Sequence, residues 1–186
     1  MRDPRRVAIL ISGRGSNMRA LVEQAVNYEV AVVASNKPAA PGLEWASERG
    51  LATWSLESKG VAKEDYDQTL SAALEEHEVG TIALAGFMRI LSPWFVGAWA
   101  GRIVNIHPSL LPSYRGLDTH ARAIAAGDAI AGCSVHLVTE ELDAGEVLGQ
   151  AQVPIAGDDT PATLEQRVLA AEHRLYPRVL NEFVLR

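Results

Sequence analysis

Short apolar runs recur along this chain, and most of them lead through a glycine-rich or polar turn into a helical pattern. The clearest runs cover 7–11, 30–34, 79–85 and 103–107, and their many β-branched residues suit strands buried on both faces. Strands that alternate with helices predict βαβ units and a parallel sheet. We therefore expect an α/β fold, with a Rossmann-like open, mostly parallel twisted sheet and helices on both faces.

The C-terminal part departs from this alternation. Small or polar residues alternate with apolar ones over 133–139, and 147–154 is typical of a return strand, so the two predict an antiparallel hairpin. A helical pattern then begins at Pro161, because proline suits the first helical turn, and continues to about residue 184. Pro177 lies inside this pattern, where the missing N–H predicts a kink or a break.

Composition limits the class of protein. The 186 residues are 48% hydrophobic and 22% charged, which suits one domain over 1–186 with a large core. The net charge of −6 argues against a nucleic-acid partner. No apolar run is long enough to span a bilayer, so we expect no membrane partner. Cys133 is the only cysteine, so we expect no intramolecular disulfide and no cysteine metal cluster. We expect a cytoplasmic protein without a metal, either a monomer or a homodimer.

A glycine turn at 12–17 connects the first strand to a helix. Such a turn leaves backbone N–H groups unpaired at the helix N-terminus, and these can bind a phosphate. The turn lacks the Gly-Lys-Ser/Thr ending of a P-loop, and Met18 stands where a dinucleotide fingerprint has its third glycine. A phosphate site and a plain strand-to-helix turn both remain open from these residues alone.

The run 103–107 carries a polar pair at its end, Asn105 and His107. Residues two apart on a strand project from the same face, so an amide and an imidazole are presented together. Pro108 then ends regular pairing, and such strand ends are where open α/β sheets place their ligands. The spacing equally suits a histidine that packs at a strand end beside an asparagine that caps a turn.

Two further segments are ambiguous. The apolar loop 86–91 follows a core strand, and it either packs under the next helix or lines a pocket for a flat apolar ligand. We expect Trp94 and Trp99, in the short helix that follows, to pack in the core. Asp143 has the local setting of a turn residue, although an ionised Asp143 near His107 would favour the charged imidazole.

The stretch Asn105-Ile-His-Pro-Ser-Leu-Leu-Pro112, with Leu142-Asp143 before Gly145, resembles the folate-dependent formyltransferase family. Nearly the whole chain shares the likeness, and the loop at 12–17 favours the branch that acts on glycinamide ribonucleotide. The resemblance implies transfer of the formyl group of 10-formyltetrahydrofolate, the cosubstrate, to the amine of that ribonucleotide in purine biosynthesis. It also implies a ribonucleotide-binding half of about 1–100 and a folate-binding, catalytic half of about 101–186.

Site residues follow from the resemblance, position by position. Asn105 would polarise the formyl oxygen, His107 would act as the acid, and Asp143 would support His107. Glu172 would contact the ribose, and the family also has a cis peptide before the proline that matches Pro112. Gly15, Ser16 and Asn17 would bind the ribonucleotide phosphate, and the folate would contact Lys63, Met88, Arg89, Ile90, Leu91, Asn105, Thr139, Glu140, Glu141 and Leu142.

Two positions depart from the family pattern. Lys63 stands where arginine is frequent, and a lysine cannot make the planar bidentate contact with the folate glutamate. Ala144 replaces a common glycine, so the turn must accept a Cβ. Within the family, a hydrolase of 10-formyltetrahydrofolate or a formyltransferase for another amine is the alternative. A non-catalytic ribonucleotide- or folate-binding module is the alternative from another class.

Overall fold

The structure is a computed structural model, and it describes residues 2–186 as one seven-stranded sheet with six helices. The elements in chain order are β1 (Arg6–Ile11), α1 (Ser16–Glu23), β2 (Glu29–Ser35), α2 (Pro41–Glu48), β3 (Thr53–Ser55), α3 (Lys63–Glu76), β4 (Thr81–Leu84), α4 (Pro93–Ala98), β5 (Ile103–His107), α5 (Thr119–Ala126), β6 (Ile130–Leu137), β7 (Val147–Pro154) and α6 (Pro161–Phe183).

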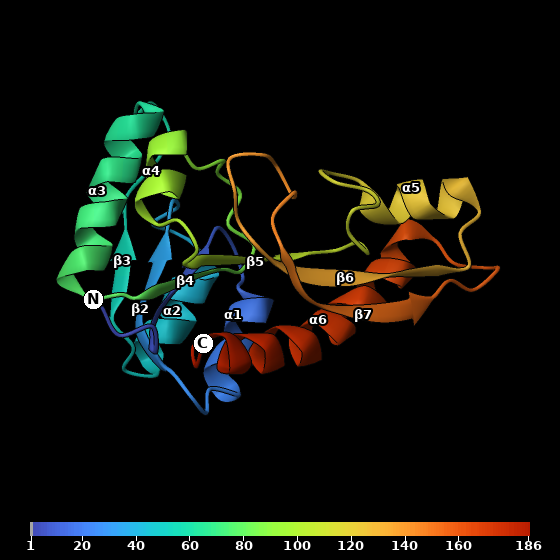
Figure 1. The fold of residues 1–186 in the computed structure, drawn as a ribbon, viewed down its shortest axis with the longest axis horizontal. Coiled ribbons are helices and arrows are strands. Elements are labelled where there is room, and N and C mark those ends of the chain that lie inside the picture. The colour runs from blue at the N-terminus through green and yellow to red at the C-terminus, as the bar shows by residue number, and fades with distance from the viewer. Residues whose placement is uncertain (1) are drawn as a thin grey trace.

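The strands lie in the order β3-β2-β1-β4-β5-β6-β7. Strands β1 to β5 pair in parallel, whereas β6 pairs antiparallel with β5 and β7 antiparallel with β6. In Figure 1 the β6–β7 hairpin extends away from the parallel part of the sheet, and α6 crosses behind it. This confirms the expected mostly parallel sheet with an antiparallel hairpin.

Helices cover both faces of the sheet, as predicted from strands whose two faces are both apolar. Val7, Ile9 and Ile11 of β1 enter a core cluster shared with α1, α2 and α6. Ala8 and Leu10 enter a second cluster with α3 and α4 on the other face. Because successive side chains of a strand point to opposite faces, one strand supports both layers.

The order of the strands determines where ligands can bind. The chain moves from β1 outward to β3 and then returns to place β4 on the other side of β1. Such a reversal opens a crevice at the carboxyl ends of the two central strands. The segments that follow β1, β4 and β5, at 12–15, 85–92 and 108–118, therefore begin at the same edge of the sheet.

Helix α6 runs through Pro177 without interruption, so the predicted break is wrong. Proline leaves the carbonyl of His173 without its usual helical donor. The side-chain Nε2 of Gln24, just after α1, donates to that carbonyl oxygen at 3.0 Å. A partner from another element thus replaces the missing hydrogen bond, which periodicity in the sequence does not reveal.

Packing of the tryptophans also differs from expectation. Trp99 is buried and stacks on Phe95, and its indole Nε1 donates to Ser71 at 2.9 Å. Trp94 is 44% exposed, so its predicted place in the core is wrong. The helix α4 has only six residues, and Phe95 and Val96, which follow Trp94, occupy its buried side.

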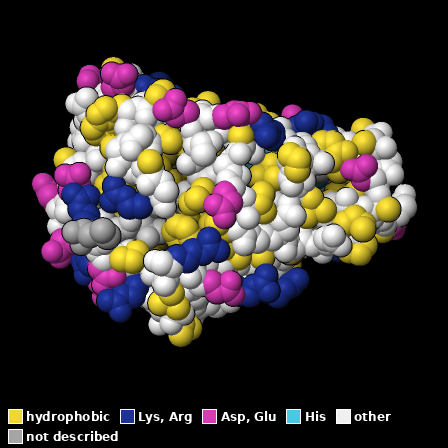
Figure 2. Space-filling view, in the orientation of Figure 1, with side chains coloured by type: hydrophobic (Ala, Val, Ile, Leu, Met, Phe, Trp, Pro, Cys, Tyr) yellow, Lys and Arg dark blue, Asp and Glu magenta, His cyan; other side chains and the backbone are white. Residues whose placement is uncertain are grey.

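Figure 2 shows acidic and basic side chains intermingled on the visible face, with no separate basic patch.

The buried hydroxyl of Tyr176 on α6 generates a stability prediction. It lies 3.1 Å from the carbonyl oxygen of Leu84 and 2.9 Å from that of Val104, and so joins α6 to β4 and β5. Tyr176→Phe should lower the free energy of unfolding by about 1–3 kcal/mol, because the loss is not compensated by water. Urea denaturation measures it. As a control, Tyr28→Phe removes a hydrogen bond to a single carbonyl, that of Leu21, and should lower the free energy of unfolding by less. A free energy of unfolding that is unchanged in Tyr176→Phe would contradict this account.

Candidate active site

A cavity of about 450 Å³ opens beside the glycine turn that follows β1. Gly15 caps α1 with a left-handed backbone at φ 70°, and no side chain caps the first N–H groups of the helix. Ser16 and Asn17, both good capping types, are instead the first residues of the helix. The uncapped N–H groups at Gly15, Ser16 and Asn17 suit an anion, because the helix dipole adds positive charge there.

Neighbouring segments hold this turn in place. The Ser12 hydroxyl donates to the Asn36 side chain at 2.5 Å and accepts from the backbone N–H of Met88 at 2.8 Å. Gly42 packs against the turn so closely that a Cβ there would contact the Ile11 side chain and the Gly13 carbonyl. The segments after β1, β2 and β4 are therefore fixed to one another by short polar and backbone contacts.

Asn17, which lines this cavity, contacts Glu172, a residue 155 positions further along the chain. The Asn17 Nδ2 donates to Glu172 Oε2 at 2.7 Å, and the side-chain oxygen of Asn17 is buried without a partner. Glu172 is 6% exposed, and burial raises its pKa to about 7, while the hydrogen bond from Asn17 lowers it in part. The pair thus offers a hydrogen-bond acceptor to a donor such as a sugar hydroxyl.

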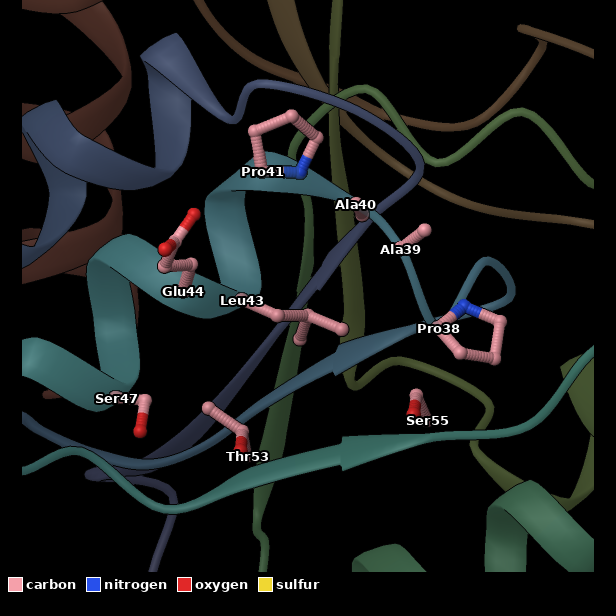
Figure 3. A pocket seen from close by; sticks show the side chains of 9 residues that line it. All are labelled: Pro38, Ala39, Ala40, Pro41, Leu43, Glu44, Ser47, Thr53 and Ser55. Atoms are coloured by element: carbon pink, nitrogen blue, oxygen red, sulfur yellow. The ribbon is translucent and has the colours of Figure 1, made fainter.

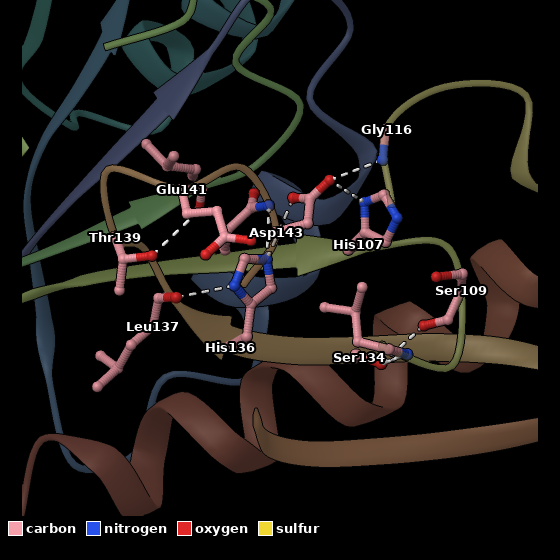
Figure 4. A network of polar contacts seen from close by, with 12 residues as sticks. His107, Ser109, Gly116, Ser134, His136, Leu137, Thr139, Glu141 and Asp143 are labelled. Atoms are coloured by element: carbon pink, nitrogen blue, oxygen red, sulfur yellow. Dashed lines mark hydrogen bonds and ion pairs between the residues drawn. The ribbon is translucent and has the colours of Figure 1, made fainter. Parts of the chain in front are cut away.

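The structure brings Asn105, His107 and Asp143 together, as the resemblance implied. Asn105 and His107 lie on β5, opposite His136 and Ser134 of β6. The carboxylate of Asp143 accepts the backbone N–H of Gly116 at 3.0 Å and lies 3.4 Å from His107 Nδ1 (Figure 4). A turn residue by its local sequence, Asp143 thus belongs to the polar centre of the site.

The surroundings of His107 determine which ring nitrogen carries hydrogen. Its Nε2 lies 2.9 Å from the carbonyl oxygen of Tyr114, an atom that can only accept, so Nε2 carries hydrogen. Its Nδ1 faces Asp143. A hydrogen on Nδ1 would point at the Asp143 carboxylate, so each ring nitrogen of His107 has an acceptor oxygen beside it. His107 is 5% exposed, which strengthens both interactions.

His136 belongs to the same network, and the sequence interpretation missed it. Its Nδ1 lies 2.8 Å from the carbonyl oxygen of Leu137 and therefore donates, which leaves Nε2 as an acceptor. Asn105 Nδ2 lies 3.1 Å from that Nε2. Burial lowers the pKa of His136, which keeps Nε2 free to accept. The signal was available: His136 lies on an alternating strand opposite Asn105, but its pairing with β5 was not inferred.

Ser134 is a second missed residue. Its hydroxyl donates to the Ser109 carbonyl at 2.7 Å and accepts the Leu111 N–H at 3.0 Å. It thereby anchors the loop after β5, which contains the expected cis peptide between Leu111 and Pro112. The loop after β6 can accept the Cβ of Ala144, because its residue with left-handed backbone is Asp143, at φ 51°, and not Ala144.

The residues assigned to folate lie in two groups. Lys63, Met88, Arg89 and Ile90 line a second cavity of about 450 Å³. Met88 and Ile90 expose apolar side chains, whereas Leu91 is buried in the core and does not present its side chain there. The second group, Thr139, Glu140, Glu141 and Leu142, forms an exposed loop that leads to Asp143.

That loop is tied to the loop after β5. The Glu141 carboxylate pairs with Arg115 at 2.6 Å, and the Thr139 hydroxyl donates to the Glu141 carbonyl at 3.1 Å. In Figure 4 Thr139 and Glu141 lie close to Asp143. The loop thus covers the polar centre from the side of β6.

A separate cavity of about 480 Å³ lies between the start of α2 and the edge strand β3 (Figure 3). Of its described lining residues only Glu44 is titratable, and no predicted site residue lines it. It therefore lacks the acid–base and donor groups gathered around His107. Within residues 2–186 no group of three metal-ligating side chains is found, and none of the described helices could cross a membrane.

Comparisons with known proteins agree with this geometry. A family model described as formyl transferase matches residues 5–180. A phosphoribosylglycinamide formyltransferase of Escherichia coli is 44% identical over 182 residues, which cover 95% of this chain and 86% of that protein. The chain is 43% identical to part of the human trifunctional purine biosynthetic protein adenosine-3, and spans 18% of its length and 14% of that of the Drosophila melanogaster protein.

A solved structure gives the same result. The crystal structure of phosphoribosylglycinamide formyltransferase from Brucella melitensis superposes with a TM-score of 0.93 at 48% sequence identity, and covers 98% of this chain and 96% of that one. The similarity extends over the sheet, the glycine turn, strand β5 with Asn105 and His107, and the loop that carries Asp143. This chain therefore belongs to the formyl transferase family.

Proposed function

We propose that this protein transfers the formyl group of 10-formyltetrahydrofolate to the primary amine of glycinamide ribonucleotide, a step in purine biosynthesis. The observation that carries this proposal is the meeting of Asn105, His107 and Asp143 at the edge of the sheet that also holds the two cavities. The names of the relatives, phosphoribosylglycinamide formyltransferase, support formyl transfer to that ribonucleotide, and membership of the formyl transferase family supports a formyl-folate as the donor.

Each substrate has a matching cavity. The ribonucleotide phosphate binds the N–H groups of 15–17, and its sugar hydroxyls contact Glu172 and the unpaired oxygen of Asn17. The folate ring lies against the exposed side chains of Met88 and Ile90, beside the loop 139–142. Lys63 supplies a positive charge for the glutamate part of the folate, as a point charge.

The chemistry is a direct transfer. The substrate amine attacks the formyl carbon, and a C–N bond forms while the carbonyl oxygen gains negative charge. Asn105, with one amide hydrogen directed to His136, uses the other to stabilise that oxygen. The amine proton passes through His107 to the leaving nitrogen of the folate as the original C–N bond breaks. Asp143 stabilises the charged imidazole during this passage.

One experiment separates the alternatives. The purified protein is incubated with 10-formyltetrahydrofolate, with and without glycinamide ribonucleotide, and tetrahydrofolate release is followed. We expect release that depends on the amine and yields one formylated amine per folate. Release without the amine would instead identify a hydrolase, and binding of both compounds without release would identify a binding module.

Substitution of the polar pair tests the mechanism. Asn105→Ala and His107→Ala should each lower kcat by roughly 10²–10³-fold, because each removes stabilisation of the transition state. Stopped assays measure kcat, and thermal melting verifies the fold. His77→Ala, at the end of α3, removes an imidazole from the opposite end of β4 and should leave kcat unchanged. Near-normal turnover in either pair variant would refute the mechanism.

His136 should act as a positioning residue for Asn105. His136→Leu removes the acceptor that orients the Asn105 amide, so kcat should fall by roughly tenfold, the effect of one neutral hydrogen bond. His136→Gln, which can still accept, should retain more activity. Steady-state kinetics should show a loss in kcat and no change in either KM. The Asn105→Ala, His136→Leu double variant should lose as much kcat as Asn105→Ala alone, which would verify that Asn105 and His136 act through the same amide.

The raised pKa of Glu172 predicts a pH-dependent stability. Between about pH 4.5 and 7 the unfolded chain has released this proton and the folded chain has not, so stability falls as pH rises through that window. Glu172→Gln removes the effect, and the variant should gain roughly 2–3 kcal/mol on wild type across the window. Urea denaturation at several pH values measures it. Glu182→Gln, an exposed change on α6, should show no such gain. If the difference in free energy of unfolding between Glu172→Gln and wild type does not change with pH, the assignment is contradicted.

A further inference from the structure

Two arginines, Arg14 and Arg19, line the cavity beside the glycine turn. They are the only charged side chains among its described lining residues, which otherwise belong to the glycine turn or are Ala85, Gly86 and Leu169. Within residues 2–186 no carboxylate oxygen lies within 4.0 Å of either guanidinium. In a chain of net charge −6, two such cations in one cavity are an uncompensated positive site.

Arg19 is held in position without an acidic partner. Its guanidinium carbon lies 5.3 Å from the centre of the Trp45 ring, and Arg49 stacks on the same ring at 3.7 Å. The Nε of Arg19 is buried and makes no hydrogen bond. A cation over an aromatic face is attracted to it and loses little freedom on binding a ligand, because its position is already defined. The donors of Arg19 are thus positioned but unused.

A buried acceptor at the same cavity indicates the kind of ligand. Asn17 is 9% exposed, and its side-chain oxygen has no hydrogen-bond partner. An acceptor of this kind requires a donor, such as a hydroxyl, whereas the arginines and the uncapped N–H groups require an anion. A sugar phosphate carries both, with hydroxyl donors a few bonds from the phosphate.

We propose that Arg19, with Arg14 beside it, determines specificity for a dianionic phosphate monoester at this cavity. The inference deepens the proposed function, because it rests on the same ribonucleotide site. Backbone N–H groups bind any small anion, but two arginines add charge that a dianion uses more fully than a monoanion. Arg19, supported on Trp45, therefore rejects substrates without the phosphate.

Direct binding tests the proposal without turnover. Isothermal titration calorimetry at about pH 8, where a phosphate monoester is a dianion, compares ribose 5-phosphate with ribose 5-sulfate, a monoanion of similar shape. Wild type should bind the phosphate more tightly than the sulfate. Arg19→Gln should weaken phosphate binding by roughly 10- to 100-fold, the effect of a charge-assisted hydrogen bond, and should remove most of the preference. Arg19→Lys should restore part of it.

Arg102→Gln is the matched control, because Arg102 also stacks on a tryptophan, Trp99, at 4.4 Å, but at the amino end of β5. It should bind ribose 5-phosphate as wild type does. Unchanged binding and preference in Arg19→Gln would overturn the proposal, as would an equal loss in Arg102→Gln, which would indicate an effect of net charge alone.

Kinetics separate this inference from the proposed function. In Arg19→Gln the KM for glycinamide ribonucleotide should rise by a similar factor while kcat is retained, and the KM for 10-formyltetrahydrofolate should stay unchanged. If wild type shows no transfer but binds ribose 5-phosphate through Arg19, the proposed function fails and the inference stands. If transfer occurs with an unchanged ribonucleotide KM in Arg19→Gln, the inference fails and the function stands.

Discussion

The site depends on the contacts that the carboxylate of Asp143 makes with the loop after β5 and with two strands. This carboxylate accepts the backbone N–H of Gly116, faces the Nδ1 of His107 at 3.4 Å and lies 3.6 Å from the Nε2 of His136. One side chain thus joins the loop after β6 to the loop after β5 and to both paired strands. Its backbone is left-handed, a conformation that costs energy outside glycine and persists only where surrounding contacts hold it.

The two histidines around Asp143 have different hydrogen-bonding environments. His107 donates from Nε2 to a carbonyl and offers Nδ1 to the carboxylate, whereas His136 donates from Nδ1 and accepts at Nε2. In the first arrangement each ring nitrogen faces an acceptor oxygen. In the second, burial lowers the pKa of His136, and the neutral ring accepts from the Asn105 amide at Nε2. In the proposed mechanism, these two residues of the same type have different roles, acid–base transfer for His107 and orientation of the amide for His136.

Much of the architecture could be predicted from the sequence, because apolar runs and proline or glycine signals are local. The strand at 103–107 and its spacing placed Asn105 and His107 together, and the parallel sheet placed the turn at 12–17 near them. Local signals alone left the function of this pair open. The resemblance supplied Asp143, whose own surroundings indicate only a turn.

What could not be predicted depends on partners distant in the chain. Gln24 replaces the hydrogen bond that Pro177 removes, and Trp45 positions Arg19 across two helices. His136 comes within hydrogen-bond distance of Asn105 only through the antiparallel pairing of β6 with β5. Periodicity indicates which face of an element is buried, but it does not indicate which side chain lies on the other side of the contact.

The central claim is that the two rings around Asp143 have opposite hydrogen placements, and ¹⁵N NMR of ring-labelled histidine measures this directly. At about pH 8, where an unperturbed imidazole is neutral, His107 should carry hydrogen on Nε2 and His136 on Nδ1. Assignment follows from His107→Ala and His136→Leu. A spectrum in which His136 carries hydrogen on Nε2, or in which both rings have the same placement, would contradict the account.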